Sequence, residues 1–211
     1  MTTNRKASLA LILGSLAGLV TMTLHPTSRD VLASLAGGGH GNLNKGVHAL
    51  ALLAQPLILM GTLVMTLRFT KQRDLAVAAY VLFAWASIAI MMATAASGFI
   101  ATEVLATGVN QRATPDAVRS ALQYTGILNR TFASVYIFFG SLAIMVWSVA
   151  MLRANEFSRA LAVYGLISGL VSILVGANSL GRTIHGFAIV VVSQGVWFLW
   201  VAFILRRLPQ S

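Results

Sequence analysis

Residues 183–205 read TIHGFAIVVVSQGVWFLWVAFIL, a run that contains no Asp, Glu, Lys or Arg. A run of this length is enough for a helix to cross the roughly 30 Å of hydrocarbon in a bilayer. Its third residue is His185, so an ionisable ring lies where the helix would enter the lipid headgroups. The stretch therefore predicts a transmembrane helix with a polar group at its mouth.

The composition supports the same interpretation for the whole chain. Of its 211 residues, 57% are hydrophobic and only 9% are charged, and the mean hydropathy is +0.82. A soluble fold of this size could not bury so much apolar surface. Further uncharged runs cover residues 7–24, 47–67, 75–102, 131–152 and 160–181. Because a helix satisfies its own backbone in lipid, we predict an all-α polytopic membrane protein, with residues 1–211 forming one bundle of six transmembrane helices.

Two segments between these runs predict short helices on the outer surface. Ser28 is a suitable N-cap for a helix over residues 29–36. Thr114, Pro115 and Asp116 supply a cap, a first-turn proline and an acid near the positive helix end, which predicts a helix over residues 115–124. Neither segment is long enough to span the bilayer.

The basic residues report topology rather than nucleic-acid binding. The formal net charge is +10, but Lys and Arg are scattered between the uncharged runs and do not gather on one face. Nine lie in the termini and alternate short loops: Arg5, Lys6, Arg68, Lys71, Arg73, Arg153, Arg159, Arg206 and Arg207. Six lie in the longer loops: Arg29, Lys45, Arg112, Arg119, Arg130 and Arg182. The positive-inside bias predicts cytoplasmic termini, with the loops around His40 and Gln111 outside.

With this topology, the polar residues gather at the extracytoplasmic ends of the helices. They are His25, His48, Glu103, Asn129, Arg130, Asn178, Arg182 and His185. Asn129, Arg130, Asn178 and Arg182 form the candidate ligand-binding set. The predicted site is therefore a polar rim on the outer side of the bundle.

The histidines raise two cofactor hypotheses. His25, His48 and His185 would converge with Glu103 on a divalent metal, because neutral imidazole and carboxylate suit zinc or a similar ion. Two facing histidines would instead hold a haem. The competing interpretation is that interfacial His, Asn and Arg are simply solvated by headgroups and water, as we expect for His40.

Small residues mark the expected packing faces. The runs at 7–24 and 160–181 carry Gly14-x-x-x-Gly18 and Gly165-x-x-x-Gly169. Glycines four residues apart leave a flat strip on one helix face, so another backbone can approach closely. We therefore expect both helices to make close helix contacts through these strips.

The function classes follow from what the chain contains. It has no cysteine, which excludes disulfides and thiolate chemistry. It has no nucleophile elbow, His-Glu-x-x-His helix or dinucleotide fingerprint either. We expect a binding or accessory membrane protein, with a metal-dependent membrane enzyme, a haem-binding protein and a small transporter as alternatives. The residues leave open whether it is catalytic. The bilayer is the expected partner, with another membrane protein or a second copy beside it, and no nucleic acid.

Three segments also carry a family resemblance. They are HPTS at 25–28, RTFASVYIFFGSLAIMVWS at 130–148 and EFSRALAVYG at 156–165. The chain resembles small six-helix bacterial integral membrane proteins of unknown function. That resemblance implies a multi-pass protein of the bacterial inner membrane, and it supplies no activity or site residues.

Overall fold

The computed structural model describes residues 3–25, 40–110, 114–155 and 157–208, and all regular structure in these ranges is helical. The helices are α1 (Thr3–Leu24), α3 (His40–Leu67), α4 (Arg73–Ala95), α5 (Ala101–Asn110), α6 (Pro115–Ala154), α7 (Arg159–Ala177) and α8 (Ile184–Arg207). A π-helical turn, η2 (Ala96–Ile100), joins α4 to α5, and a 3₁₀ turn, η3 (Ser179–Arg182), precedes α8.

Six of the described helical segments are long and apolar enough to cross a membrane. These segments are Thr3–Leu24, Asn42–Leu67, Arg73–Gly108, Pro115–Ala154, Arg159–Ala177 and Ile184–Arg207. Large apolar side chains cover their outer faces, among them Leu53 at 67% exposure and Trp85 at 64%. Such a surface suits contact with lipid, so the all-helical, multi-pass prediction is confirmed.

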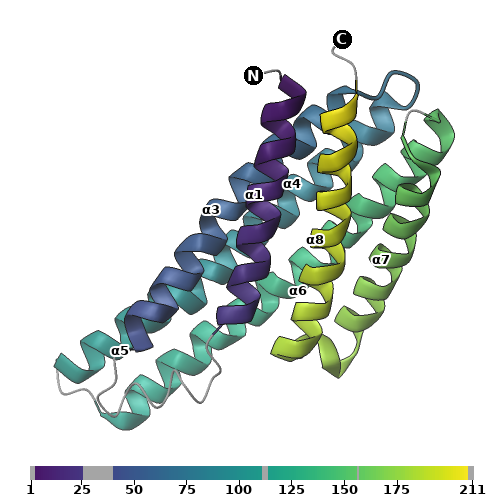
Figure 1. Cartoon of the computed structure of the whole chain (residues 1–211). Helices are drawn as coiled ribbons and strands as arrows, with labels where there is room; N and C mark the ends of the chain where they lie inside the picture. The colour runs from purple at the N-terminus through teal and green to yellow at the C-terminus, as the bar shows by residue number, and fades with distance from the viewer. Residues whose placement is uncertain (1–2, 26–39, 111–113, 156, 209–211) are drawn as a thin grey trace.

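The six spans form a closed ring in chain order. Each packs on the next, from α1 through α3, α4, α6 and α7 to α8, and α8 packs back on α1 (Figure 1). Both termini lie at one end of the bundle, which we call the terminus end (Figure 1). We call the opposite end, where α1 ends and α8 begins, the distal end. Few contacts cross the ring, so no helix occupies its centre.

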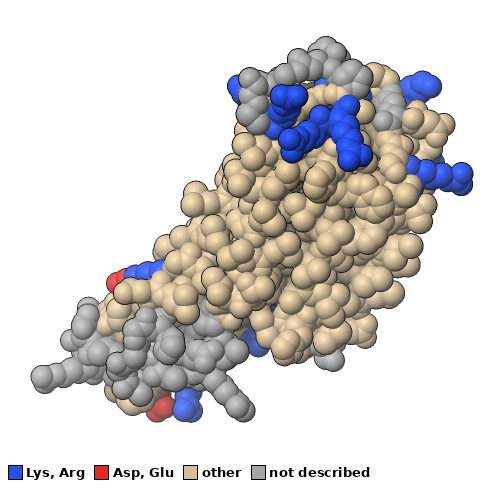
Figure 2. All heavy atoms as spheres, in the orientation of Figure 1, with Lys and Arg blue, Asp and Glu red and all other residues tan. Residues whose placement is uncertain are grey.

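The terminus end is basic and is held together by polar contacts. Lys and Arg gather there, whereas the side of the bundle carries a wide uncharged band (Figure 2). Arg68 donates to Asn4 Oδ1 from Nε at 3.1 Å and from Nη2 at 2.6 Å. Asn4 Nδ2 in turn donates to the Leu208 carbonyl at 3.4 Å. These bonds join both ends of the chain to the end of α3.

Large aromatic side chains fill the ring on the terminus side. Phe83, Trp147, Trp197 and Phe198 are all buried, and the centres of neighbouring rings lie 5.3–5.9 Å apart. Trp147 Nε1 donates to Thr66 Oγ1 and to the Ala76 carbonyl, both at 3.1 Å. This aromatic core therefore joins α3, α4, α6 and α8 and leaves no room for a channel at that level.

The glycine strips make the close contacts expected of them, with one exception. A Cβ on Gly14 would lie 2.9 Å from the Ala54 carbonyl of α3. A Cβ on Gly169 would lie 2.9 Å from the Ser141 carbonyl of α6. Gly18, by contrast, has no atom within 4 Å of an added Cβ. Close packing thus ends near the middle of α1, and open space begins beside Gly18.

Helix α6 differs from the prediction. Separate helices were expected over 115–124 and 131–152, but one continuous helix covers both. Asn129 and Arg130 do not interrupt it, because a polar side chain on a partly exposed helix face leaves the backbone hydrogen bonds intact. The predicted start is confirmed, since Thr114 Oγ1 accepts from the Ala117 amide at 3.3 Å. The expected helix over 29–36 lies outside the described residues.

Candidate functional site

A cavity of about 610 Å³ occupies the ring between the aromatic core and the distal end. It lies among α1, α3, α4, α6 and α8, and η2 and η3 each contribute one residue to its wall. Phe198 belongs both to the cavity wall and to the aromatic core, so it closes the cavity on the terminus side. At the other end the wall includes the exposed side chains Gln123 and Arg130.

Two helices contribute regular stripes to the cavity wall. The stripe on α1 contains Gly14, Gly18, Thr21, Met22 and, just after the helix, His25. The stripe on α3 contains His48, Ala51, Ala54, Gln55 and Ile58. Both have the spacing of three and four residues that marks a single helix face. The polar residues of the two stripes therefore face the same space.

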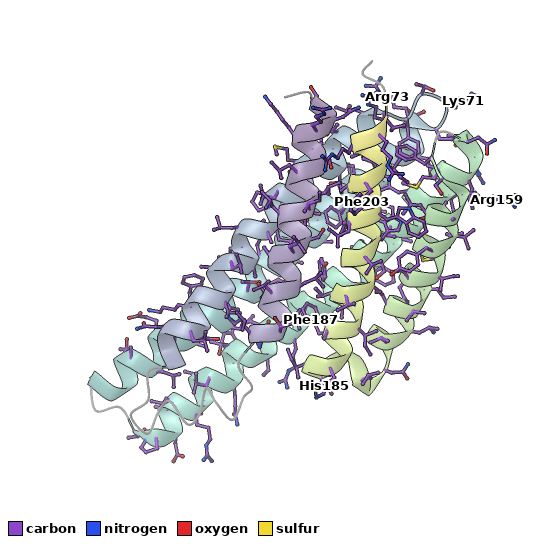
Figure 3. The ribbon with its side chains drawn as sticks, viewed as in Figure 1. Lys71, Arg73, Arg159, His185, Phe187 and Phe203 are labelled. Atoms are coloured by element: carbon purple, nitrogen blue, oxygen red, sulfur yellow. The ribbon has the colours of Figure 1, made fainter. Side chains whose placement is uncertain are left out.

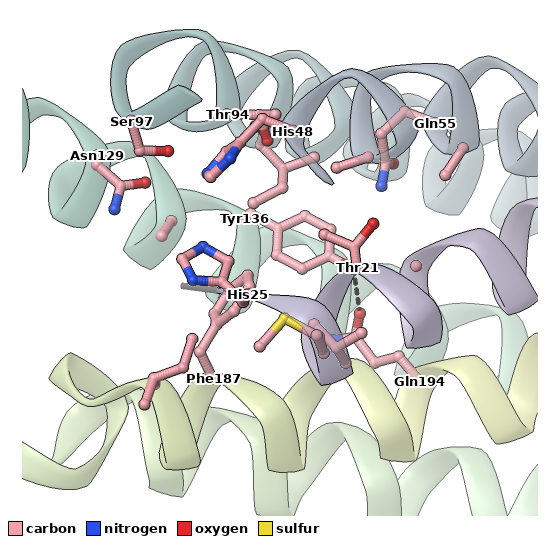
Figure 4. Close-up of a pocket in the computed structure, with 18 of the residues that line it drawn as sticks. Thr21, His25, His48, Gln55, Thr94, Ser97, Asn129, Tyr136, Phe187 and Gln194 are labelled. Atoms are coloured by element: carbon pink, nitrogen blue, oxygen red, sulfur yellow. Dashed lines mark hydrogen bonds between the residues drawn. The ribbon is translucent and has the colours of Figure 1, made fainter. Parts of the chain in front are cut away.

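His25 and His48 meet across the cavity. Their ring centres lie 5.0 Å apart with an angle of 65° between the ring planes, and Figure 4 shows them facing each other near Asn129 and Ser97. His48 is only 3% exposed. Its Nδ1 lies 2.8 Å from the Asn44 carbonyl. Because a carbonyl only accepts, Nδ1 carries the hydrogen, and the neutral ring keeps its lone pair on Nε2.

The π-helical turn positions His48. Asn44 Nδ2 donates to the Ser97 carbonyl and to Thr102 Oγ1, both at 3.0 Å. A Cβ on Gly98 would overlap the His48 side chain. The imidazole thus lies directly on the backbone of η2, and Asn44 fastens α3 to the same turn. Turns of this kind are frequent at functional sites.

A second polar group lies deeper in the cavity, on the terminus side of the histidines (Figure 4). Tyr136 Oη donates to Gln194 Oε1 at 2.9 Å. Gln194 Nε2 donates to Ser141 Oγ at 3.1 Å. Gln194 is 1% exposed, so these bonds join α6 to α8 in the interior of the bundle. A glutamine that bonds through both its oxygen and its nitrogen is held in one orientation.

Two further polar atoms on the wall have no hydrogen-bond partner. They are Ser15 Oγ on α1 and Gln55 Oε1 on α3, and both are buried. A buried polar atom without a partner costs roughly 1–3 kcal/mol. Both residues line the cavity, so a rotation of either side chain would bring its polar atom to a ligand or water inside it.

The other predicted site residues are divided between the cavity and the surface. Asn129 and Arg130 line the distal part of the cavity. Asn178 is exposed and donates from Nδ2 to the Leu174 carbonyl of its own helix at 2.6 Å. Arg182 lies in η3, and the placement of its side chain is outside the described part of the structure.

His185 and Glu103 do not join the two paired histidines. His185 is exposed and lies at the distal tip of α8, at the opposite end from Lys71, Arg73 and Arg159 (Figure 3). It does not line the cavity. Glu103 is 69% exposed, and its Oε2 lies 3.9 Å from Lys45 Nζ. Within the described ranges, no three His, Cys, Asp or Glu residues form a group that could hold a metal, so the expected convergence of three histidines with Glu103 is not found.

No family model, curated protein or solved structure matches this chain.

The spacing of the paired histidines argues against one of the two cofactor hypotheses. Two axial imidazoles on opposite sides of a haem iron would hold their ring centres more than about 6 Å apart. The ring centres of His25 and His48 are 5.0 Å apart. The pair as it stands is too close to occupy both axial positions of a haem.

The sequence interpretation missed several residues of the cavity. Tyr136, Gln194 and Met22 line the cavity but are not among the site residues predicted above. Asn44, whose carbonyl lies 2.8 Å from His48 Nδ1, is not among them either. The available signal was the i, i+3, i+7 spacing of Gly18, Thr21 and His25 on one stretch and of His48, Ala51 and Gln55 on another, which predicts two polar faces at the same depth.

Proposed function

We propose that the protein binds a small molecule in its central cavity and acts as a binding or accessory protein of the bacterial inner membrane. We place both termini in the cytoplasm, because nine of the fifteen Lys and Arg residues belong to the terminus end and its short loops. The cavity then opens toward the extracytoplasmic side. The observation that carries the proposal is the cavity of about 610 Å³, together with the buried polar atoms of Ser15 and Gln55 on its wall that have no hydrogen-bond partner.

The wall indicates the chemistry of the ligand. Ile58, Ile90, Phe187, Val191 and Phe198 give it a large apolar surface. Its polar groups are histidine, amide and hydroxyl side chains, and no Asp or Glu is among the described residues that line it. Arg130 is the one Lys or Arg among the lining residues that the structure describes. These groups suit an amphiphile with an apolar body and a neutral or anionic polar end.

The same features favour binding over transport. A transporter needs a path that can open to either side, usually through broken helices near the middle of the membrane. Here the described wall ends at Phe198, which packs against Phe83 with 5.3 Å between ring centres. A cavity closed by such packing suits capture or presentation of a ligand from one side.

The experiment compares two glycine variants of the full chain by native mass spectrometry after mild extraction from membranes. In Gly18→Leu the new side chain would enter the cavity, because a Cβ there has no neighbour within 4 Å and Gly18 lines the wall. In Gly46→Leu the new side chain would also be unobstructed, but Gly46 lies outside the lining. We expect a bound small molecule on the wild type and on Gly46→Leu, and at least a tenfold lower bound fraction on Gly18→Leu. Absence of any bound molecule from the wild type, or equal retention in both variants, would contradict the proposal.

A further inference from the structure

We infer that His25, His48 and Met22 form a binding site for a soft monovalent metal cation, with Cu(I) as the biological representative. The inference rests on the proposed function only in taking the cavity as a binding site. It adds a ligand of a different kind, held at the distal part of the wall. Met22 lies one helical turn before His25, and all three residues line the same cavity.

The separation of the two rings suits a shared ion. A ring nitrogen coordinates a metal at about 2.0–2.1 Å, and the ring centre lies about 1.2 Å farther along the same line. Two imidazoles on one ion at a roughly tetrahedral angle therefore have their ring centres about 5 Å apart. The observed distance between the ring centres of His25 and His48 is 5.0 Å, which matches this separation.

The surroundings of His48 are those of a metal-ligating histidine. Such a residue almost always donates its second ring N–H to a carbonyl or carboxylate, which sets the tautomer and the direction of the coordinating nitrogen. His48 Nδ1 makes this bond to the Asn44 carbonyl at 2.8 Å. The Asn44 side chain is itself bonded to the Ser97 carbonyl and to Thr102 Oγ1. The lone pair of Nε2 is thereby presented by a fixed ring.

Charge and ligand type select the ion. No carboxylate is found among the described lining residues, and Arg130 lies on the same wall. The cost of moving an ion out of water rises with the square of its charge, so without an anionic ligand a divalent ion costs about four times as much as a monovalent one. Thioether sulfur also favours Cu(I) over Zn²⁺ or Mg²⁺. A site with two imidazoles, one thioether and no anion therefore favours Cu(I).

The test measures Cu(I) affinity in nanodiscs under anaerobic conditions, by competition with a chromogenic Cu(I) chelator. We expect one Cu(I) per chain in the wild type, and no displacement by a tenfold excess of Zn²⁺. His25→Asn and His48→Asn should each weaken Cu(I) binding by at least about 100-fold. Mutation of a residue that only hydrogen-bonds to a metal ligand already lowers metal affinity by about 10–100-fold. Met22→Leu should weaken Cu(I) binding by about tenfold and remove the sulfur contribution from the copper X-ray absorption spectrum.

Matched controls separate the site from general effects. His185→Asn changes an exposed histidine outside the cavity, and Met60→Leu changes an exposed methionine outside it; both should bind Cu(I) as the wild type does. His25→Asn changes a residue that follows the end of α1, and Met22→Leu nearly conserves the side-chain volume, so both variants should fold. They therefore keep the test valid if His48→Asn does not fold. Wild-type binding no tighter than that of His25→Asn, or equal loss in His185→Asn, would overturn the inference.

The two proposals fail separately. If Gly18→Leu loses an organic molecule that the wild type retains, while Cu(I) binding does not depend on His25, the ligand-binding proposal stands and the metal site does not. If Cu(I) binds through His25 and Met22 but no organic molecule is retained, the cavity serves the metal alone.

Discussion

The side chain of His48 lies directly on the backbone of Gly98, so close that a methyl group on Gly98 would overlap it. We therefore expect Gly98→Ala to push the imidazole or the π-helical turn aside and to destabilise the protein by about 1–3 kcal/mol. The measurement is reversible unfolding in mixed micelles of denaturing and mild detergent. Gly46→Ala is the control on α3: its Cβ would meet nothing within 4 Å, so it should be neutral or stabilising by up to about 1 kcal/mol. Equal stability of both variants would contradict this account of η2.

Gly169 provides the corresponding test for the packing of α7 on α6. An added Cβ would overlap the Met145 side chain and lie 2.9 Å from the Ser141 carbonyl. Gly169→Leu should separate the two helices and cost about 1–3 kcal/mol by the same unfolding measurement. Gly46→Leu again serves as control, and a Gly169→Leu protein as stable as the wild type would mean that this face can open without loss.

Trp147 is expected to be a strong contributor to the aromatic core. Its indole N–H is shared between Thr66 Oγ1 and the Ala76 carbonyl. Trp147→Phe keeps an aromatic ring but removes the donor, so two buried acceptors lose a partner. We expect the free energy of unfolding to fall by about 1–3 kcal/mol. Trp85→Phe changes a side chain that is 64% exposed on the outer face. The free energy of unfolding of Trp85→Phe should differ from that of the wild type by less than about 0.5 kcal/mol. A similar loss of unfolding free energy in both variants would show that the indole hydrogen bonds of Trp147 contribute little.

A double-mutant cycle tests the bond between Tyr136 and Gln194. Tyr136→Phe removes the donor to Gln194 Oε1, and Gln194→Leu removes the acceptor together with the bond to Ser141. In lipid such bonds average about 0.6 kcal/mol and reach about 1.7. We expect a coupling energy near the upper value because both side chains are buried. Strictly additive losses would mean that the two side chains are stabilised independently.

The proposed orientation can be tested by labelling, because the chain has no native cysteine. Ser120→Cys lies in the distal part of α6, and Lys71→Cys lies between α3 and α4 at the terminus end, and both side chains are exposed. With cytoplasmic termini, a membrane-impermeant maleimide added to intact spheroplasts should label Ser120→Cys. It should label Lys71→Cys only after lysis. The reverse pattern would invert the orientation and move the cavity mouth to the cytoplasm.

The sequence predicts the spans well because charge in hydrocarbon is expensive. The uncharged run at 183–205 matches α8, Ile184–Arg207, and the run at 47–67 ends with α3 at Leu67. Arg68 and Arg206 lie where the runs end, because each charged group must reach the headgroups or find a polar partner. The ends of α6 and α4 were harder to predict, since Arg130 is exposed within a continuous helix and η2 is shaped by tertiary contact with His48.

The sequence predicts the level of the candidate site along the bundle axis, but not the direction in which each side chain points. His25, His48 and His185 were all expected at one end of the bundle, and the structure places them there. Only His25 and His48 turn inward. A helix that is apolar on all faces gives little indication of which side meets its neighbours, so the exposure of His185 could not be predicted from its position. Gln194 and Tyr136 are polar groups in apolar runs, and their pairing depends on how α6 and α8 meet.

The closure of the cavity by Phe198 on the terminus side affects how fast a bound molecule can leave. A molecule bound beside Gln55 and Gln194 lies between Phe198 and the paired histidines, so on its way to the distal end it passes His25 and His48. Two occupants would therefore behave as a stack, in which the last to arrive is the first to depart. A cation seated between the histidines would lengthen the residence time of anything beneath it without touching that molecule.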